Sequence, residues 1–74
     1  MKSVNRTVLA VSGMRDNNCR VRVSEALEAV SGVRDVCVNL FRAQATVDHE
    51  SDCDPAALVE SVARAGFAAR VTSR

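Results

Sequence analysis

Residues 7–27 read TVLAVSGMRDNNCRVRVSEAL, and this stretch contains a predicted strand, a short loop and a predicted helix. The apolar run from Thr7 to Val11 is typical of a strand. A helix is expected from Asn17 to Val30, because apolar residues recur there at the spacing of one helix face. Asp16 in the loop between them and Cys19 in the first turn of the helix have the spacing with which a Cys-x-x-Cys pair presents two thiolates to one metal ion.

The rest of the chain adds three predicted strands and one helix. Asp54-Pro55 is a strong helix start, since an N-cap carboxylate precedes a proline at the first helical position. The expected elements are a strand at Val33 to Leu40, a turn at residues 41–44, a strand at Ala45 to His49, a helix to about Ala65 and a short strand at Phe67 to Val71. The order β-α-β-β-α-β predicts an α+β, ferredoxin-like fold, with both helices on one face of a four-stranded antiparallel sheet.

Length and composition indicate one small domain over residues 1–74, without a linker. The net charge of +1 gives no general attraction to nucleic acid or membranes, and two phenylalanines are too few for a base-stacking platform. No apolar run approaches the roughly 20 residues of a membrane span or the core of a secretory signal. Three cysteines cannot all pair internally, so we expect free thiols in a reducing cytoplasm. A start at Met1 and closure after the fourth strand favour a free-standing protein.

Features of an enzyme are lacking in the sequence. It offers no arguable Ser-His-Asp or Cys-His arrangement, no paired carboxylates for a cleft and no glycine-rich phosphate loop. The three glycines are all expected at turns or helix ends. A binding module is therefore expected, and not an enzyme.

The residues around the loop resemble the heavy-metal-associated (HMA) domain family, which includes bacterial copper chaperones and the soluble domains of metal-transporting ATPases. Gly13-Met14-x-Asp16-x-x-Cys19 falls on the family motif Gly-Met-x-Cys-x-x-Cys, and Gly66-Phe67 falls on its closing Gly-Tyr. Further positions match the family's apolar pattern: Val23, Ala26, Leu27, Gly32, Val33, Val36, Val38, Leu40, Ala45, Val47, Leu58, Val62 and Ala65. The resemblance implies copper handling and a copper-transporting ATPase or another metal target as partner. The chain departs from the motif where Asp16 replaces the first cysteine.

Copper(I) is a soft ion that prefers thiolates, commonly two in a near-linear arrangement, and a carboxylate oxygen is a poor substitute. Cys19 is therefore the expected main ligand. A second thiolate would come from glutathione, from Cys19 of a second chain in a metal-bridged homodimer, or from a target protein. Alternatively, Asp16 and Cys19 hold Zn²⁺ with added ligands. The competing hypothesis is a thiol-redox or glutathione-linked interaction module that has lost metal binding.

Cys19 is expected in the first turn of the first helix, where unpaired N–H groups and the helix dipole favour an anion. Nearby arginines add positive potential, so a reactive thiolate is predicted. Asp16 is either a metal ligand or an N-cap that accepts from the backbone N–H of Asn18 or Cys19. The resemblance implies that Met14 anchors the loop in the core and that Phe67 shields the site from water.

The remaining candidate ligands are weaker. Cys37 is expected on the outward face of its strand, and Cys53 just before the second helix, both distant from Cys19. His49 is a lone histidine at the end of a strand, so we expect an ordinary surface residue there. Within one chain it is the weakest of the metal-ligand candidates. Its use as a ligand between two chains stays open.

Overall fold

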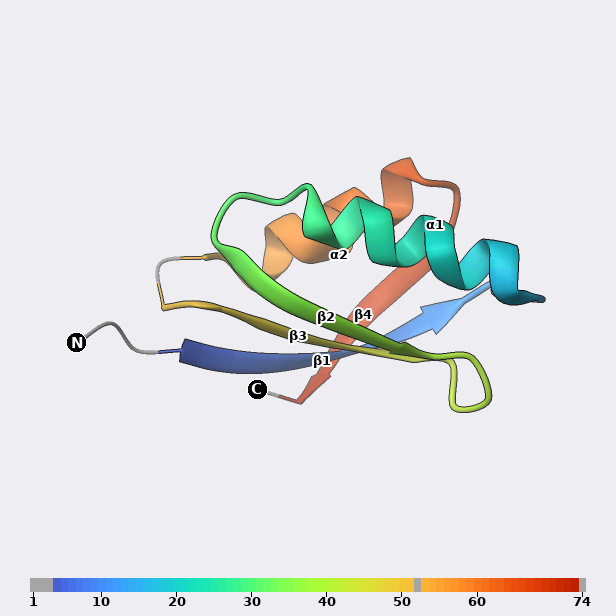
Figure 1. Cartoon of the computed structure of the whole chain (residues 1–74), viewed down its shortest axis with the longest axis horizontal. Coiled ribbons are helices and arrows are strands. Elements are labelled where there is room, and N and C mark those ends of the chain that lie inside the picture. The colour runs from blue at the N-terminus through green and yellow to red at the C-terminus, as the bar shows by residue number, and fades with distance from the viewer. Residues whose placement is uncertain (1–3, 52, 74) are drawn as a thin grey trace.

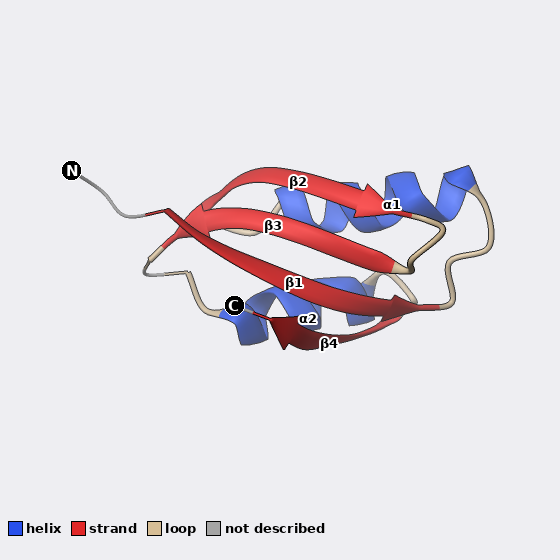
Figure 2. Cartoon of the chain, turned by 90° about the horizontal axis from the view of Figure 1, so that it is seen from below, coloured by secondary structure: helices blue, strands red, loops and turns tan. Residues whose placement is uncertain are grey.

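The computed structural model describes residues 4–51 and 53–73 of the chain. Its elements follow the predicted order: β1 (Val4–Ser12), α1 (Asn17–Glu28), β2 (Val33–Asn39), β3 (Gln44–Glu50), α2 (Pro55–Arg64) and β4 (Ala68–Ser73). The four strands form one sheet in the order β2-β3-β1-β4, and every neighbouring pair is antiparallel. Both helices cover the same face of the sheet and leave the other face open (Figures 1 and 2). The predicted ferredoxin-like fold is confirmed.

The element bounds differ from the prediction mainly at β1 and α1. β1 begins three residues earlier than the apolar run suggested, because it pairs with β3 from Val4 to Ala10. Cross-strand pairing therefore extends the strand through polar residues that have weak strand propensity of their own. α1 ends at Glu28 and not at Val30, because Ala29 is its C-cap and the Val30 N–H bonds to the Leu27 carbonyl at 3.1 Å.

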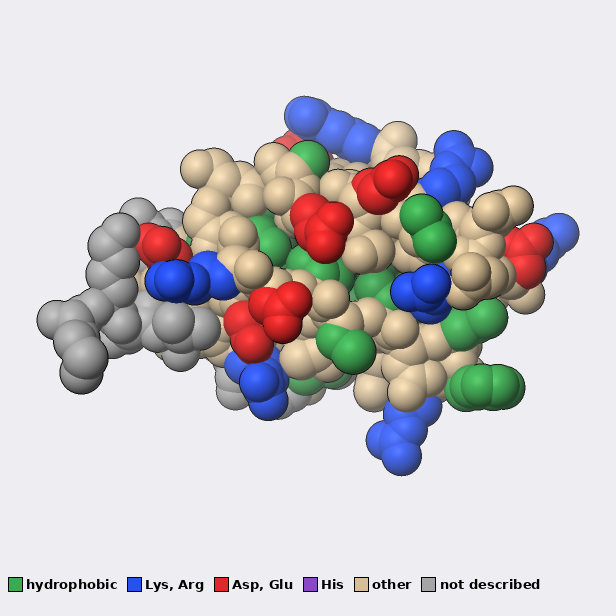
Figure 3. All heavy atoms as spheres, viewed as in Figure 1, with side chains coloured by type: hydrophobic (Ala, Val, Ile, Leu, Met, Phe, Trp, Pro, Cys, Tyr) green, Lys and Arg blue, Asp and Glu red, His purple; other side chains and the backbone are tan. Residues whose placement is uncertain are grey.

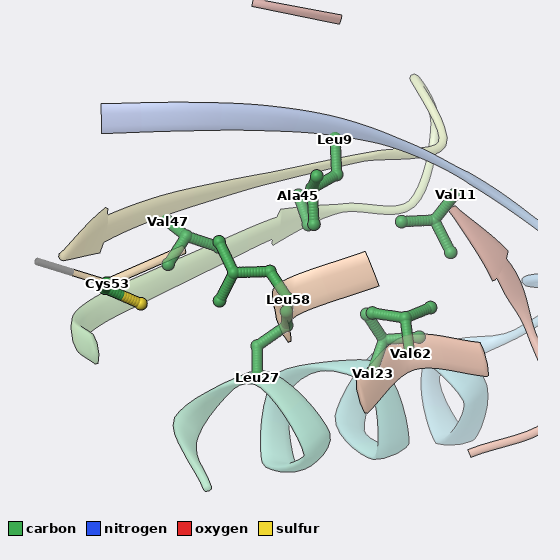
Figure 4. Close-up of a cluster of buried hydrophobic side chains, with 9 residues drawn as sticks. All are labelled: Leu9, Val11, Val23, Leu27, Ala45, Val47, Cys53, Leu58 and Val62. Atoms are coloured by element: carbon green, nitrogen blue, oxygen red, sulfur yellow. The ribbon is translucent and has the colours of Figure 1, made fainter. Parts of the chain in front are cut away.

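The core lies between the sheet and the two helices. Leu27 and Val23 of α1 and Leu58 and Val62 of α2 are fully buried, as the helical spacing predicts. Figure 4 shows these four side chains pointing toward the inner face of the sheet. Their partners there are buried at every second position of the two central strands: Leu9, Val11, Ala45 and Val47.

The two ends of β1 define two ends of the molecule. At the carboxyl end of β1, residues 13–19 lead into α1, and the β2–β3 turn lies beside them because the Val11 N–H donates to the Ala43 carbonyl at 2.8 Å. We call residues 13–19 and 40–43 the loop end. At the amino end of β1, residues 5–7 lie beside residues 49–51 and 53–55, which we call the far end. In Figure 1 the loop end is on the right and the β3–α2 connection is on the left.

Candidate metal site

Asp16 caps the first helix and fixes the position of Cys19 beside it. Its backbone is extended (φ −148°, ψ −177°), and its side-chain Oδ1 accepts a hydrogen bond from the Cys19 backbone N–H at 3.1 Å. This bond satisfies one of the N–H groups that the first turn of a helix leaves without an intrahelical partner. The capping alternative for Asp16 is therefore what the structure contains.

Hydrogen bonds from Cys19 stabilise the negative charge of Asp16. The backbone N–H of Cys19 has the largest effect and lowers the pKa of the Asp16 carboxyl below its usual 3.8. A hydrogen bond from the Cys19 side chain and a smaller one from the Asn18 backbone lower this pKa further, against a small opposing effect of burial. Asp16 is thus ionised at neutral pH, and its negative charge lies against the Cys19 thiol.

Cys19 is a free, half-buried thiol in the first turn of α1. The neighbouring Arg20 is held along the helix, because its Nε donates to Asn17 Oδ1 at 2.7 Å. Arg15 is exposed on the approach to the helix. The Asp16 carboxylate thus lies beside the Cys19 thiol, and Arg15 and Arg20 lie close to Cys19 in the sequence.

Met14 and Phe67 form the support of the loop. Both side chains are half-buried and pack against the hydrophobic core. Gly13 has a φ of +98°, and a Cβ at this position would lie 3.4 Å from Cδ1 of Phe67. Phe67 therefore packs directly against the start of the loop. Its role as a shield around a bound metal stays a prediction.

The surface of the loop end carries two arginines, Arg15 and Arg42, the acidic Asp16 and the apolar Phe41. In the space-filling view, several acidic side chains lie over the middle of the molecule, and the right-hand end carries basic, acidic and hydrophobic side chains (Figure 3). Phe41 is fully exposed in the turn of the β2–β3 hairpin, and Arg42 beside it is exposed as well.

Cys37 and Cys53 are remote from Cys19. Cys37 is exposed on β2, where it pairs with Thr46 on the open face of the sheet, and Cys53 is buried at the far end. Within residues 4–51 and 53–73, no three His, Cys, Asp or Glu side chains come together to hold a metal ion. In this part of the chain, Cys19 is therefore the one thiol that the loop end offers.

The prediction that His49 is an ordinary surface residue is wrong. Its side chain is only 2% exposed, and both ring nitrogens have partners: Nε2 lies 2.6 Å from Thr7 Oγ1, and Nδ1 lies 2.9 Å from the Glu50 carbonyl oxygen. A carbonyl oxygen only accepts, so Nδ1 carries the proton, and the Thr7 hydroxyl donates to Nε2. Ala45 and Val47 point inward, and the two-residue period of a strand places His49 on the same inward face. This period was the signal in the sequence that His49 is buried. Sequence reasoning did not identify Thr7.

This fold and this loop are those of the heavy-metal-associated domain. The model of that family matches residues 8–68, and the chain belongs to the family. In sequence it is 42% identical over 67 residues to a copper-exporting P-type ATPase of Mycobacterium tuberculosis, an alignment that covers 90% of this chain and 9% of the ATPase. The chain thus spans about a tenth of the length of that relative.

Solved structures of similar domains agree with this assignment. The N-terminal domain of PacS from Synechocystis PCC6803 superposes with a TM-score of 0.86 at 33% identity, covering 93% of this chain and 98% of that domain. The CopZ metallochaperone superposes with a TM-score of 0.83 at 26% identity, covering 92% of this chain and all (100%) of that protein. In the described residues, no helix is long and apolar enough to cross a membrane.

Proposed function

We propose that this chain is an atypical copper(I) chaperone or buffer domain that binds the metal through Cys19. The second thiolate comes from glutathione, from Cys19 of a second chain or from a target protein. Residues 1–74 act as one domain in the cytoplasm, and the metal goes to a copper-transporting ATPase or another metal target. The relatives support this choice of metal, since one similar curated protein is a copper-exporting ATPase and a metallochaperone shares the fold.

The observation that carries the proposal is the position of Cys19. Its thiol lies in the first turn of α1, half-buried and oriented by the Asp16 cap, in a loop supported by Met14 and Phe67. Copper(I) is a soft ion, for which thiolate sulfur is the preferred ligand. A site with one protein thiolate leaves a coordination position for the incoming sulfur, which favours transfer over storage.

Asp16 contributes charge and orientation rather than a copper bond. A carboxylate oxygen is a hard ligand and competes poorly for copper(I). Its negative charge still lies against the sulfur and favours a cation there. The nearby guanidinium groups of Arg15 and Arg20 favour an anionic small thiol such as glutathione as the second ligand.

The test is a copper(I) titration against a competing chelator, with and without glutathione. The protein should carry Cys37→Ser and Cys53→Ala, so that Cys19 is its only thiol, and the matched control adds Cys19→Ser. We expect glutathione-dependent binding of one copper per chain in the first protein and none in the control. If both proteins compete equally poorly for copper, the copper proposal fails.

The same pair of proteins tests the alternative of a thiol-redox module. Oxidised glutathione would then form a mixed disulfide with Cys19 rapidly and reversibly, in a chain that has no measurable copper affinity. Mass spectrometry of the adduct, with reduction by glutathione as the reverse step, identifies this outcome. A reversible mixed disulfide without copper affinity would favour the thiol-redox module over the copper chaperone.

A further inference from the structure

β2 is an edge strand, and within residues 4–51 and 53–73 no strand pairs with its outer side. Figure 2 shows it along one margin of the sheet, with β4 along the other. The pairing of β2 with β3 shifts register after Val33 and is regular from Asp35 to Asn39. Cys37 is therefore the middle residue of the regular part. An edge of this kind presents backbone N–H and C=O groups to which a further strand can pair.

We propose that this edge pairs antiparallel with β2 of a second copy of the chain, about a two-fold axis that passes beside Cys37. Cys37 then faces Cys37 of the second copy, Val36 faces Val38, and Asp35 faces Asn39. The axis is perpendicular to the sheet, so the helices of both copies stay on one face. The proposal depends on the edge of β2 and not on the proposed function of Cys19.

The backbone of this edge is oriented for such pairing. The Val36 N–H donates to Asp35 Oδ1 at 3.0 Å, which places this N–H on the side of the strand away from β3. Backbone groups alternate between the two sides of a strand, so Val38 presents its N–H and C=O at the same outer edge. Val36 and Val38 of the second copy therefore exchange both N–H···O bonds, and the two-fold axis repeats this exchange.

The side chains also complement one another in this register. Val36 and Val38 are half-buried at the margin of the core, so each pair of facing valines buries apolar surface that a single chain exposes. On the open face, Asn39 Oδ1 accepts from the Arg42 N–H at 3.1 Å, which leaves the Asn39 NH₂ group as a donor for Asp35 of the second copy. Asp35 is the only charged residue from 35 to 39, so no like charges face each other.

Pairing exchanges one hydrogen bond of Asp35 for another. In the single chain its carboxylate covers the Val36 N–H, and a charged side chain on an edge strand opposes uncontrolled association. In the pair this N–H donates to the Val38 carbonyl of the second copy, and the carboxylate accepts from the Asn39 amide. Because bonds are exchanged and not simply gained, the association is reversible and depends on protein concentration.

The antiparallel arrangement separates the two Cys19 loops. β2 runs from the far end to the β2–β3 turn at the loop end, so the loop end of one copy lies beside the far end of the other. The two Cys19 thiols are then at opposite ends of the joined sheet and cannot share one ion. The edge pair is thus distinct from a copper-bridged dimer, and it forms without metal.

Disulfide trapping tests the register in a metal-free chain whose only thiol is Cys37, made by Cys19→Ser and Cys53→Ala. Oxidised glutathione is the oxidant. The Cys37 thiolate displaces one glutathione thiolate to form a mixed disulfide, and Cys37 of the second copy displaces the other. Residues that face each other in this way have Cα atoms about 4.5 Å apart, which a disulfide can bridge. We expect the protein–protein disulfide as the main product, measured by mass spectrometry.

The matched control moves the thiol one strand inward, by Cys37→Ser together with Thr46→Cys in the same background. Residue 46 lies beside residue 37 in the register of β2 and β3. Edge pairing leaves its two copies about 14 Å apart, at three strand spacings, which is too far for a disulfide. Its protein–protein disulfide should form at least about tenfold more slowly. Equal rates would overturn the proposal, because random collision or stacking of the open faces would then explain both.

A second measurement uses the chain without substitutions, in metal-free reducing buffer. As the protein concentration rises, the amide NMR signals of Val36 and Val38 should shift and their hydrogen exchange should slow. A mixture of labelled and unlabelled chains should show an intermolecular Overhauser effect between these two residues. Amide signals that stay unchanged up to millimolar protein would exclude the interface. Neither measurement uses Cys19 or copper, so failure here leaves the proposed copper function unaffected, and failure of the copper titration leaves this interface intact.

Discussion

At the scale of single residues, Asp16 accounts for most of what separates this chain from a two-thiolate metal loop. The turn glycine, the methionine under the loop and the thiol in the first helical turn are all in place. Asp16 also performs a structural task, because it caps α1 through the Cys19 N–H. Replacement of this residue therefore changes both metal affinity and helix stability, and the two effects can be separated.

The first prediction concerns Asp16→Cys in a chain that also carries Cys37→Ser and Cys53→Ala. Two thiolates from one loop should raise copper(I) affinity by orders of magnitude and remove its dependence on glutathione, because a soft ligand replaces a hard one. Chelator competition measures this. Asp16→Ser is the control, since serine retains the cap without adding a thiolate, and its affinity should not exceed that of the parent chain, because the charge of Asp16 is lost. Unchanged affinity in a folded Asp16→Cys protein would mean that the loop geometry does not suit two sulfurs.

The second prediction concerns pH. The pKa of Asp16 is lower in the folded chain than its ordinary 3.8, so ionised Asp16 stabilises the fold. This contribution is fully present above about pH 5 and is lost as the pH falls through the lowered folded-state pKa. The stability difference between the parent and Asp16→Ala should therefore be constant near neutrality and narrow in acid. Urea unfolding at a series of pH values measures it, and a difference that widens in acid would contradict the assignment.

At the scale of secondary-structure elements, the sequence predicts the helices and strands well where periodicity and capping agree. Asp54 caps α2 through the Ala56 N–H at 3.0 Å, as the Asp-Pro pair indicated. The sequence missed the environment of His49, because that depends on Thr7, which is 42 positions away. Only the register of β1 against β3 brings these residues together, and a single sequence does not specify that register. That the second ligand of Cys19 comes from outside the loop of one chain stays a prediction.

The third prediction tests the hydrogen bond between Thr7 of β1 and His49 of β3 at the far end. Thr7→Val keeps the shape of the side chain but leaves the buried Nε2 of His49 without its donor, which costs about 1–3 kcal/mol of unfolding free energy. Chemical denaturation measures this loss. Thr72→Val is the matched control, because Thr72 Oγ1 donates to the Val8 carbonyl at 3.1 Å on an exposed part of the sheet. Equal effects of the two substitutions would show that burial of the Thr7–His49 pair carries no special cost.

At the scale of the whole molecule, the fold keeps its thiols apart. β1 has nine residues and spans roughly 25 Å between the far end and the loop end. Cys19 and Cys53 lie at these opposite ends, and Cys37 lies on the open face of the sheet. No two of the three can therefore bind one ion within a chain, and a second thiolate for Cys19 requires another molecule.

The last prediction follows from this separation. In the Cys19-only chain without small thiols, one protein sulfur leaves copper(I) under-coordinated, so the metal should link two chains through their Cys19 sulfurs. Native mass spectrometry at increasing copper should show a dimer that holds one metal ion. Added glutathione should convert this dimer into a monomer with mixed ligation, because a mobile thiol competes with the second chain for the same coordination position. A tight one-to-one monomeric complex without any small thiol would contradict the argument, since the loop end would then contain a second strong ligand. A chain that also carries Cys19→Ser should form neither the copper-bridged dimer nor the mixed complex with glutathione. This control distinguishes a dimer bridged through Cys19 from one that associates through the exposed Phe41.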